Sequence, residues 1–154
     1  MNNIEIRLAY DELDNVQKLL QEYSCNSKVD FSFQNFENEL NNLSNKYAMP
    51  LGRIYTVYFK KKLAGCLAFH PINHTACEFK RLYIKPDFRK KKLAQLLLEK
   101  AIQDARNIGY LYIYLDTMNY LEDAIHLYEK FGFNETTAYH NNHIPNIKYY
   151  KLIL

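Results

Sequence analysis

The sequence predicts an α+β fold in one domain over residues 1–154, with a mixed central sheet of about seven strands flanked by about four helices. Strand-like alternation and hairpin signals dominate residues 53–84, which indicates antiparallel pairing in this half of the sheet. A helical repeat of apolar residues then leads into Tyr110–Leu115, a segment that is apolar or aromatic on both faces. Such a segment is typical of a central strand reached by a crossover helix.

The first third of the chain is expected to form one short strand and two helices. Residues 4–8 alternate apolar and polar side chains, which predicts a half-buried strand. Asp11 is the expected N-cap of a helix whose apolar positions repeat at helical spacing through Tyr23. A second helix is expected to carry Phe33, Phe36, Leu40 and Leu43.

Three strands are expected to follow as a meander. Residues 54–59 and 63–69 read as a hairpin around the basic turn Lys60–Lys62, and Ala76–Ile84 reads as the third strand. Strict alternation along this strand predicts one face formed by Glu78, Lys80, Leu82 and Ile84, and an opposite face formed by Phe79, Arg81 and Tyr83.

The second half is expected to contain two further helices between strands. The first helix is predicted to bury Leu93, Leu96, Leu97, Ala101, Ile102 and Ala105, and to end at Gly109. Residues 116–119 are expected to turn the chain after the central strand. The next helix is marked by Ala124, Leu127, Tyr128 and Phe131 and closed by Gly132. Strands from Phe133 onward and over residues 148–154 complete the sheet.

Composition limits the class of protein. Apolar residues make up 48% of the chain, and 14 Tyr with 9 Phe predict an aromatic core rather than disorder. A net charge of +3 gives little support to a nucleic-acid or membrane role spread over the surface. No apolar run approaches the roughly 18 residues of a membrane span. Three cysteines without a CxxC spacing, and no secretory pattern at the start, predict a reducing cytoplasmic location.

The basic turn Phe88–Ala94 lies between a predicted strand and the first turn of a predicted helix. The first N–H groups of a helix have no partner within it, and the helix dipole adds positive charge there. A phosphate group satisfies both, so the turn is a candidate phosphate site. Taken alone, the same residues could be a solvated helix end or, with Lys60–Lys62, a nonspecific nucleic-acid patch.

The order of motifs resembles the acyl-CoA-binding half of the GNAT N-acetyltransferase superfamily. The matching features are a strand, an Arg-x-x-x-x-Ala turn, a helix, a strand, and then Asn119, Ala124 and the run Leu127-Tyr128-Glu129-Lys130-Phe131-Gly132-Phe133. They cover about residues 76–133. The resemblance implies an acetyl-CoA-dependent enzyme that acetylates a primary amine of a small molecule or protein. A non-catalytic acyl-CoA-binding or regulatory domain is the alternative, and nucleic-acid binding is a third.

The resemblance also implies the residues that bind the coenzyme. These are Leu82, Tyr83, Ile84, Arg89, Lys90, Lys91, Lys92, Leu93, Ala94 and Asn119. Lys92 departs from the family pattern, because a glycine most often stands at its position and permits close backbone approach. With a helical φ, Lys92 is expected to fit if its side chain points away from the pyrophosphate.

Two residues are candidates for the chemistry. Tyr128 matches the family tyrosine that often protonates the leaving thiolate, and a phenol with a pKa near 10 is protonated at neutral pH. Its helical spacing with Ala124 and Phe131 is equally consistent with packing alone. Glu78 is a candidate general base, because several relatives carry a carboxylate on this strand. It could equally be an exposed partner of Lys80 in an ion pair.

The acceptor site is expected opposite the coenzyme, between the first two helices and the loop before the last strand. Its candidates by location are Tyr23, Phe31, Phe33, Tyr139, His140 and Asn142, although aromatic residues at these places could be plain core. The pairs His70/His74 and His140/His143 lack a completing ligand nearby, so no metal is expected. An exposed edge strand near the C-terminus could pair two copies in a homodimer.

Overall fold

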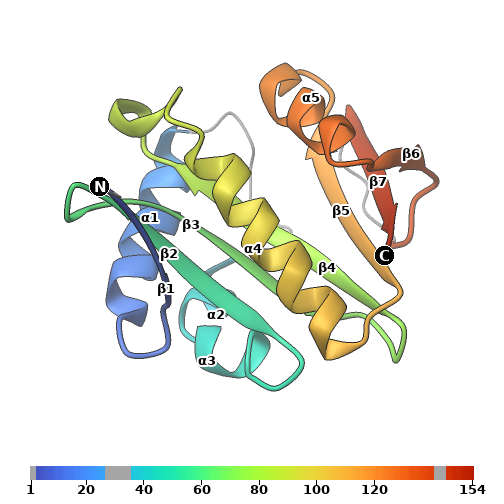
Figure 1. Ribbon diagram of the computed structural model, residues 1–154, viewed down its shortest axis with the longest axis horizontal. Helices are drawn as coiled ribbons and strands as arrows, with labels where there is room; N and C mark the ends of the chain where they lie inside the picture. The colour runs from blue at the N-terminus through green and yellow to red at the C-terminus, as the bar shows by residue number, and fades with distance from the viewer. Residues whose placement is uncertain (1–2, 27–35, 141–144) are drawn as a thin grey trace.

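A computed structural model describes residues 3–26, 36–140 and 145–154, and its strands form one seven-stranded sheet in the order β1-β2-β3-β4-β5-β7-β6 (Figure 1). The strands are β1 (Ile4–Leu8), β2 (Arg53–Phe59), β3 (Lys62–Pro71), β4 (Ala76–Ile84), β5 (Tyr112–Met118), β6 (Asn134–Thr136) and β7 (Ile147–Ile153). The helices are α1 (Leu13–Asn26), α2 (Phe36–Leu40), α3 (Leu43–Lys46), the 3-10 turn η2 (Pro86–Phe88), α4 (Leu93–Ile108) and α5 (Glu122–Lys130).

The sheet is mixed, as predicted. Only β4 and β5 pair in parallel among these strands, and α4 is the crossover between them. Parallel neighbours need such a crossover, whereas antiparallel neighbours can be joined by a tight turn. The predicted α+β class and mixed sheet are confirmed.

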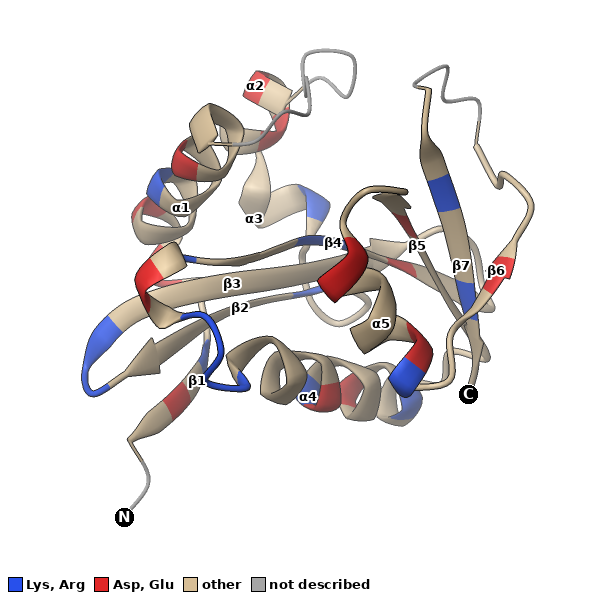
Figure 2. Ribbon diagram, turned by 90° about the horizontal axis from the view of Figure 1, so that it is seen from above, with Lys and Arg blue, Asp and Glu red and all other residues tan. Residues whose placement is uncertain are grey.

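Helices cover both faces of the sheet, with α1, α2 and α3 on one face and α4 and α5 on the other (Figure 2). Each face has its own core. Leu97 of α4 and Ile113 of β5 belong to the larger core, and Leu19 of α1 packs with Ile54 of β2 in the smaller one. The sheet therefore separates two layers, and a ligand between β4 and β5 would meet both.

The first helices differ from prediction at their ends. Helix α1 begins at Leu13, which leaves Glu12 rather than Asp11 at the capping position. The single predicted second helix is two short helices, α2 and α3, because the chain turns at Asn41 and Asn42. Phe33 lies outside the described residues.

Helix α4 ends where the sequence predicts. Gly109 has a φ of +111°, a left-handed conformation that glycine adopts without steric cost, and its N–H bonds the carbonyls of the last helical turn. The buried face differs at one position, because Leu98 is buried where Leu96 was expected. The apolar stripe of α4 otherwise packs on the sheet as predicted.

A β-bulge interrupts β4, and the predicted strict alternation is wrong. The register with β3 shifts between Cys66 and Ala68, and Arg81 has a φ of +66°. Phe79 and Leu82 consequently both contact the α4 core, while Tyr83 joins the core on the α1 face. A bulge adds one residue to a strand, so side chains beyond it change face.

Strand β5 is longer and more one-sided than predicted. It continues through Asp116 and Thr117 to Met118, where the sequence indicated a turn. Its side chains alternate, with Ile113, Leu115 and Thr117 buried and Tyr112, Tyr114 and Asp116 half-buried. The expectation of a segment buried on both faces was wrong, because Tyr112 and Tyr114 face a more open side of the sheet.

Strands β4 and β5 pair only at their first three positions, which end with Glu78 opposite Tyr114. Beyond this pair the strands diverge toward α5, as Figure 1 shows. Strand β7 fills the other side of β5, so the edges of the sheet are β1 and the short β6. The C-terminal strand β7 is therefore interior, and the short β6 just before it is the edge strand nearest the C-terminus. No helix in the described part of the chain is long and apolar enough to cross a membrane.

Candidate active site

The diverging strands β4 and β5 open a cleft of about 880 Å³. The loop before α4 and the first turns of α5 form its other walls. Pockets of this size hold cofactors and substrates, and open α/β sheets bind ligands where neighbouring strands part. The cleft gathers most of the predicted coenzyme residues, namely Leu82, Tyr83, Ile84, Arg89, Lys90, Lys92, Leu93 and Ala94.

The basic loop has an unusual backbone. Lys90 and Lys92 both have a φ of +63°, and Lys92 is the N-cap of α4 in a left-handed conformation. The helical φ expected for Lys92 is therefore wrong: the residue adopts the conformation that a glycine would take most easily. The loop thus keeps a glycine-like path with a charged side chain.

The loop also exposes a row of main-chain donors. Within the described residues, no hydrogen bond occupies the N–H groups of residues 90–95, and the first α4 bond of this region runs from Leu96 N–H to the Lys92 carbonyl. Arg89 Nε donates to the Ile84 carbonyl at 3.0 Å, which ties the loop to the end of β4. Unfilled N–H groups at a helix start beside basic side chains suit a phosphate.

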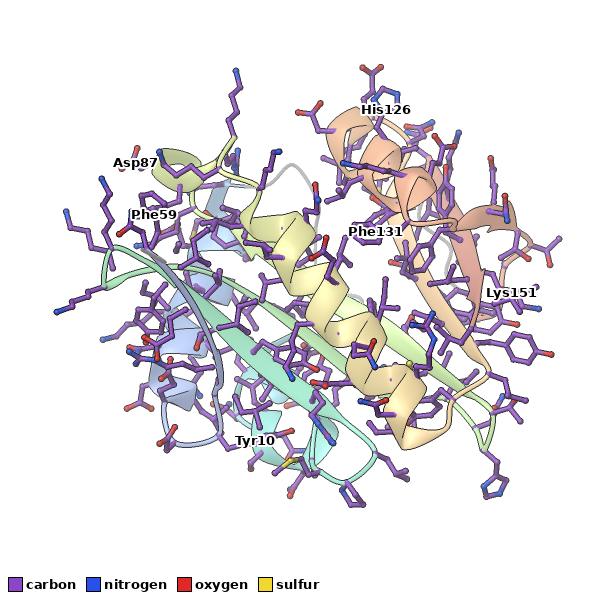
Figure 3. The ribbon with its side chains drawn as sticks, in the orientation of Figure 1. Tyr10, Phe59, Asp87, His126, Phe131 and Lys151 are labelled. Atoms are coloured by element: carbon purple, nitrogen blue, oxygen red, sulfur yellow. The ribbon has the colours of Figure 1, made fainter. Side chains whose placement is uncertain are left out.

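Two predicted coenzyme residues lie beside the cleft without lining it. Lys91 places its ammonium 4.9 Å from the ring centre of Phe59. Asn119 follows β5 in a turn, where its N–H donates to the Asn146 carbonyl at 2.7 Å. Figure 3 shows Phe59 at the end of the sheet next to the loop, with Asp87 farther out on η2.

Tyr128 lines the cleft from α5. Its side chain packs against Phe133 and Tyr150, and only 8% of the residue is exposed. Burial raises the pKa of Tyr128, and the nearby Tyr23 and Asp116 raise it further. The hydroxyl has no hydrogen-bond partner among the residues the structure describes. His126 lies on the outer side of the same helix, as Figure 3 shows.

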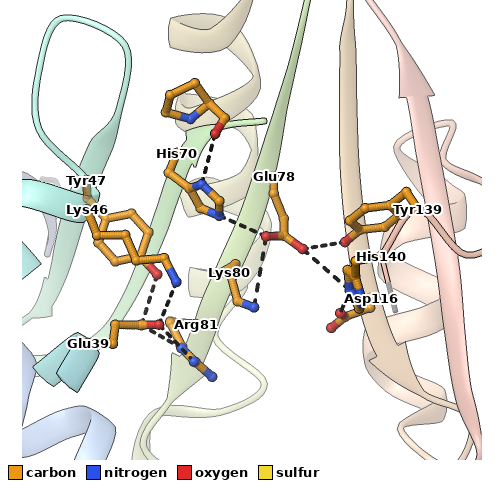
Figure 4. A network of polar contacts seen from close by, with 11 residues as sticks. Glu39, Lys46, Tyr47, His70, Glu78, Lys80, Arg81, Asp116, Tyr139 and His140 are labelled. Carbon is orange, nitrogen blue, oxygen red and sulfur yellow. Dashed lines mark hydrogen bonds and ion pairs between the residues drawn. The ribbon is translucent and has the colours of Figure 1, made fainter. Parts of the chain in front are cut away.

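Glu78 is buried at the point where β4 and β5 separate. The alternative of an ion pair with Lys80 holds, with Lys80 Nζ 3.9 Å from Glu78 Oε1, but the pair is largely buried and not exposed. Tyr139 O–H donates to Glu78 Oε2 at 2.6 Å, and His70 Nε2 lies 2.8 Å from Glu78 Oε1 (Figure 4). Although burial opposes ionisation, the bond to His70 and the charge of Lys80 lower the pKa of Glu78 to about 2. Glu78 does not line the cleft.

A second buried carboxylate anchors the bulge of β4. Arg81 donates two hydrogen bonds to Glu39, at 2.8 and 3.0 Å, and Lys46 and Tyr47 donate to the same carboxylate (Figure 4). Burial opposes ionisation of Glu39, but Arg81 and Lys46 lower its pKa to about 2. Helix α2 therefore holds the bulge through an ion pair.

The structure adds charged residues that sequence reasoning did not select. Lys80 and Asp116 line the cleft from β4 and β5, together with Arg81 and Thr117. Asp116 was predicted to be in a turn, and Lys80 was considered only as a partner of Glu78. Buried and half-buried side chains alternate along β5 as far as Met118. This alternation is the sequence signal that could have predicted Asp116 as part of the strand and not of a turn.

The acceptor candidates separate into three groups. Tyr23 lines the cleft and stacks on Tyr83 with ring centres 4.9 Å apart. Tyr139 and His140 do not line the cleft, but they contact residues at its border. His140 Nε2 lies 2.7 Å from Oδ2 of Asp116, which does line the cleft. Phe31, Phe33 and Asn142 fall outside the described residues.

One group of side chains has the composition of a metal site. Ligand atoms of Glu78, Asp116 and His140 lie within 4.8 Å of one another. Each of the three already accepts or makes a hydrogen bond within this group or to Tyr139. The hydrogen bonds account for the arrangement, whereas His74 is exposed elsewhere and His143 lies outside the described residues.

Comparisons with known proteins agree with this geometry. Residues 15–133 match the model of the acetyltransferase (GNAT) family. A Schizosaccharomyces pombe protein named as an uncharacterized N-acetyltransferase is 40% identical over 96% of this chain and 91% of its own length. An acetyltransferase structure from Streptococcus agalactiae has a TM-score of 0.81 at 20% identity and covers 100% of both chains. A Salmonella typhimurium structure, described as a putative acetyltransferase with acetyl-CoA, has a TM-score of 0.74 at 16% identity and covers 99% of this chain and 94% of its own. The chain belongs to the GNAT acetyltransferase family.

Proposed function

We propose that this protein transfers the acetyl group of acetyl-CoA to a primary amine of a small molecule or peptide. The observation that carries the proposal is that one cleft joins a loop of unfilled N–H groups at the start of α4 to the buried phenol of Tyr128. The Salmonella typhimurium neighbour with the same fold binds acetyl-CoA, which supports this ligand.

Two parts of this chain would bind two different parts of the coenzyme. The N–H groups of residues 90–95, with Arg89 and Lys90 at the cleft wall, would hold the pyrophosphate. The main chain of β4 over residues 82–84, unpaired on the side of β5, would bond the pantetheine arm. When bound, acetyl-CoA supplies the thioester that is attacked.

Tyr128 is the proposed general acid. In the transfer, the neutral amine nitrogen forms a bond to the thioester carbonyl carbon and loses one proton to solvent. The carbon–sulfur bond breaks, and the Tyr128 hydroxyl gives its proton to the leaving sulfur. The phenolate then regains a proton from solvent. The raised pKa of Tyr128 keeps the phenol protonated at neutral pH, and its lack of a hydrogen-bond partner within the described chain leaves the proton available.

Glu78 is proposed as a positioning residue. Its predicted role as general base remains untested, but a carboxylate with a pKa of about 2 and both oxygens engaged takes up protons weakly at neutral pH. Its bonds to His70 and Tyr139 hold β3 and the loop after β6 on either side of the strand divergence. An amine that binds in its neutral form needs no base.

We further propose that residues 1–154 act as one catalytic unit in a reducing cytoplasm. All seven strands belong to a single sheet, and Cys66 and Cys77 are buried free thiols. Self-association remains a proposal too, with β1 and β6 as the available edges.

The test is a coenzyme-dependent mass-shift assay. The purified chain is incubated with acetyl-CoA and a panel of amino acids, polyamines, aminoglycosides and peptides, and each amine is examined for a gain of one acetyl group. We expect at least one acetylated amine and measurable coenzyme binding by calorimetry. Binding without transfer to any amine would instead support a non-catalytic acyl-CoA-binding domain.

A further inference from the structure

Lys80 and Asp116 occupy matching positions on the two diverging strands. The last parallel pair is Glu78 with Tyr114, so continuing that register by two residues on each strand brings Lys80 opposite Asp116. Had the strands remained paired, these side chains would be neighbours on one face of the sheet. Because the strands separate there, a cation and an anion face each other across the cleft that both line.

Lys80 has unused hydrogen-bond donors. Its ammonium lies 3.9 Å from Glu78 Oε1, beyond hydrogen-bond distance, and no hydrogen bond from Nζ is found within residues 3–26, 36–140 and 145–154. Only 13% of the side chain is exposed. Burial lowers the pKa of Lys80, while the carboxylates of Glu78 and Asp116 oppose that change. A cation so placed is stabilised by a ligand that brings an anionic oxygen.

Asp116 has a carboxylate oxygen that is available to accept hydrogen bonds from a ligand. Its Oδ2 lies 2.7 Å from His140 Nε2, and its other oxygen has no hydrogen bond to any described residue. The side chain is 15% exposed and borders the cleft. A carboxylate oxygen can accept more than one hydrogen bond, so Asp116 can bind an ammonium while His140 holds its orientation.

The charged side chains next to Lys80 and Asp116 already have hydrogen-bond partners within the protein. Arg81 is bound through two hydrogen bonds by Glu39, and the oxygens of Glu78 are taken by His70 and Tyr139. Lys80 and Asp116 are therefore the charged pair at this end of the cleft with capacity for a ligand. Phe79 and Leu115 lie in the same core as Tyr128, so Lys80 and Asp116, which follow them on the alternating strands, face the other side of the sheet.

We propose that the acetyl acceptor is a free α-amino acid, whose amino group is bound by Asp116 and whose carboxylate is bound by Lys80. The amino group enters as an ammonium and gives one proton to solvent water before its nitrogen attacks the thioester carbon. This inference rests on the acetyl transfer proposed above and specifies its acceptor. An α-amino acid carries both charges on adjacent groups, so it can bridge the two strands. Polyamines would place a second cation near Lys80, and the N-terminus of a peptide has no carboxylate beside its amine.

The first experiment compares free amino acids with their carboxamides. The wild-type chain is given acetyl-CoA and either a mixture of the twenty common L-amino acids or the corresponding L-amino acid amides, and acetylated products are quantified by mass. We expect kcat/KM for the best free acid to exceed that for its amide by about 10-fold or more, because a charged hydrogen bond contributes this much. Equal or better use of amides, or of spermidine, would overturn the proposal.

The second experiment changes Lys80. Lys80→Met keeps the apolar stem and should lower kcat/KM for the free acid by about 10- to 100-fold, mainly through KM, with little effect on the amide. Lys85→Met is the matched control, since Lys85 directly follows the same strand, lies near Glu22 and does not line the cleft. A free-acid preference that survives Lys80→Met would contradict the assigned role of Lys80.

A binding measurement separates this proposal from the proposed activity. Ligand-observed NMR with the coenzyme A-loaded protein should detect the same free amino acid, and the signal should disappear in Lys80→Met and Asp116→Asn. Coenzyme binding by these two variants should stay within about threefold of wild type. If amines other than amino acids are acetylated, the activity stands and the acceptor assignment fails. If no amine is acetylated, the NMR result alone decides whether the amino-acid site exists.

Discussion

Arg81 of β4 and Glu39 of α2 form a buried, doubly hydrogen-bonded ion pair at the bulge that precedes the open end of the cleft. Arg81 is held there with a φ of +66°, a conformation that costs an L-residue about 1–2 kcal/mol. The partner helix therefore stabilises a backbone shape that the local sequence does not favour. This shape sets which residues of β4 reach the cleft.

Removing one partner of this ion pair should be strongly destabilising. We expect Arg81→Met or Glu39→Gln to lower the free energy of unfolding by about 3–5 kcal/mol, because each change breaks the doubly hydrogen-bonded ion pair inside the protein. Urea unfolding measures the change. The double variant Arg81→Met/Glu39→Gln should lose much less than the sum of the single changes, and strict additivity would argue against a coupled pair.

Stability should fall in acid because two buried carboxylates are ionised in the folded protein. The folded-state pKa values of Glu39 and Glu78 are lowered to about 2, below the ordinary value of 4.5. Their contribution is therefore complete above about pH 4.5 and is lost as the pH falls toward 2. Each carboxylate contributes on the order of 3 kcal/mol by this linkage.

Thermal unfolding between pH 7 and pH 2 tests that contribution. Glu39→Gln or Glu78→Gln should lower the melting temperature at pH 7 and flatten its fall below pH 5. Glu37→Gln is the matched control, since Glu37 is exposed on the same short helix as Glu39. An unchanged slope in both buried variants would show that other groups cause the acid sensitivity.

Tyr128→Phe should reduce turnover without weakening coenzyme binding. General acid catalysis contributes about 10²- to 10⁴-fold, so we expect kcat to fall by at least about 100-fold while KM for acetyl-CoA changes little. Tyr150→Phe is the control, because Tyr150 packs on Tyr128 but does not line the cleft. Equal activity in wild type and Tyr128→Phe would remove Tyr128 from the mechanism.

Lys92→Gly should stabilise the loop, because glycine adopts the observed left-handed conformation without steric cost. The expected gain in unfolding free energy is about 1 kcal/mol, measured by urea denaturation. Lys91→Gly is the control, because it removes the same charge at a neighbouring residue that does not have a positive φ. This change should give no gain in unfolding free energy. Calorimetry with coenzyme A at two salt concentrations should show that either change weakens the attraction of the phosphates.

The order of the elements and the helix start at the basic loop follow from local patterns. Apolar periodicity predicts α4 and α5, Gly109 marks the end of α4, and Pro86 stops β4 before the loop. These features depend on residues close together in the chain, so the sequence is sufficient to predict them. The run from Leu127 to Phe133 likewise predicted that Tyr128 lies on a helix, which is α5.

Nonlocal packing decided the rest of the site. The bulge at Arg81 depends on Glu39, which lies far earlier in the chain, and the divergence of β4 from β5 depends on a register that no single segment contains. The same divergence brings Lys80 opposite Asp116 and makes Asp116 part of a cleft rather than a turn. Side chains distant in sequence meet only when the sheet is assembled, so local periodicity could not predict these contacts.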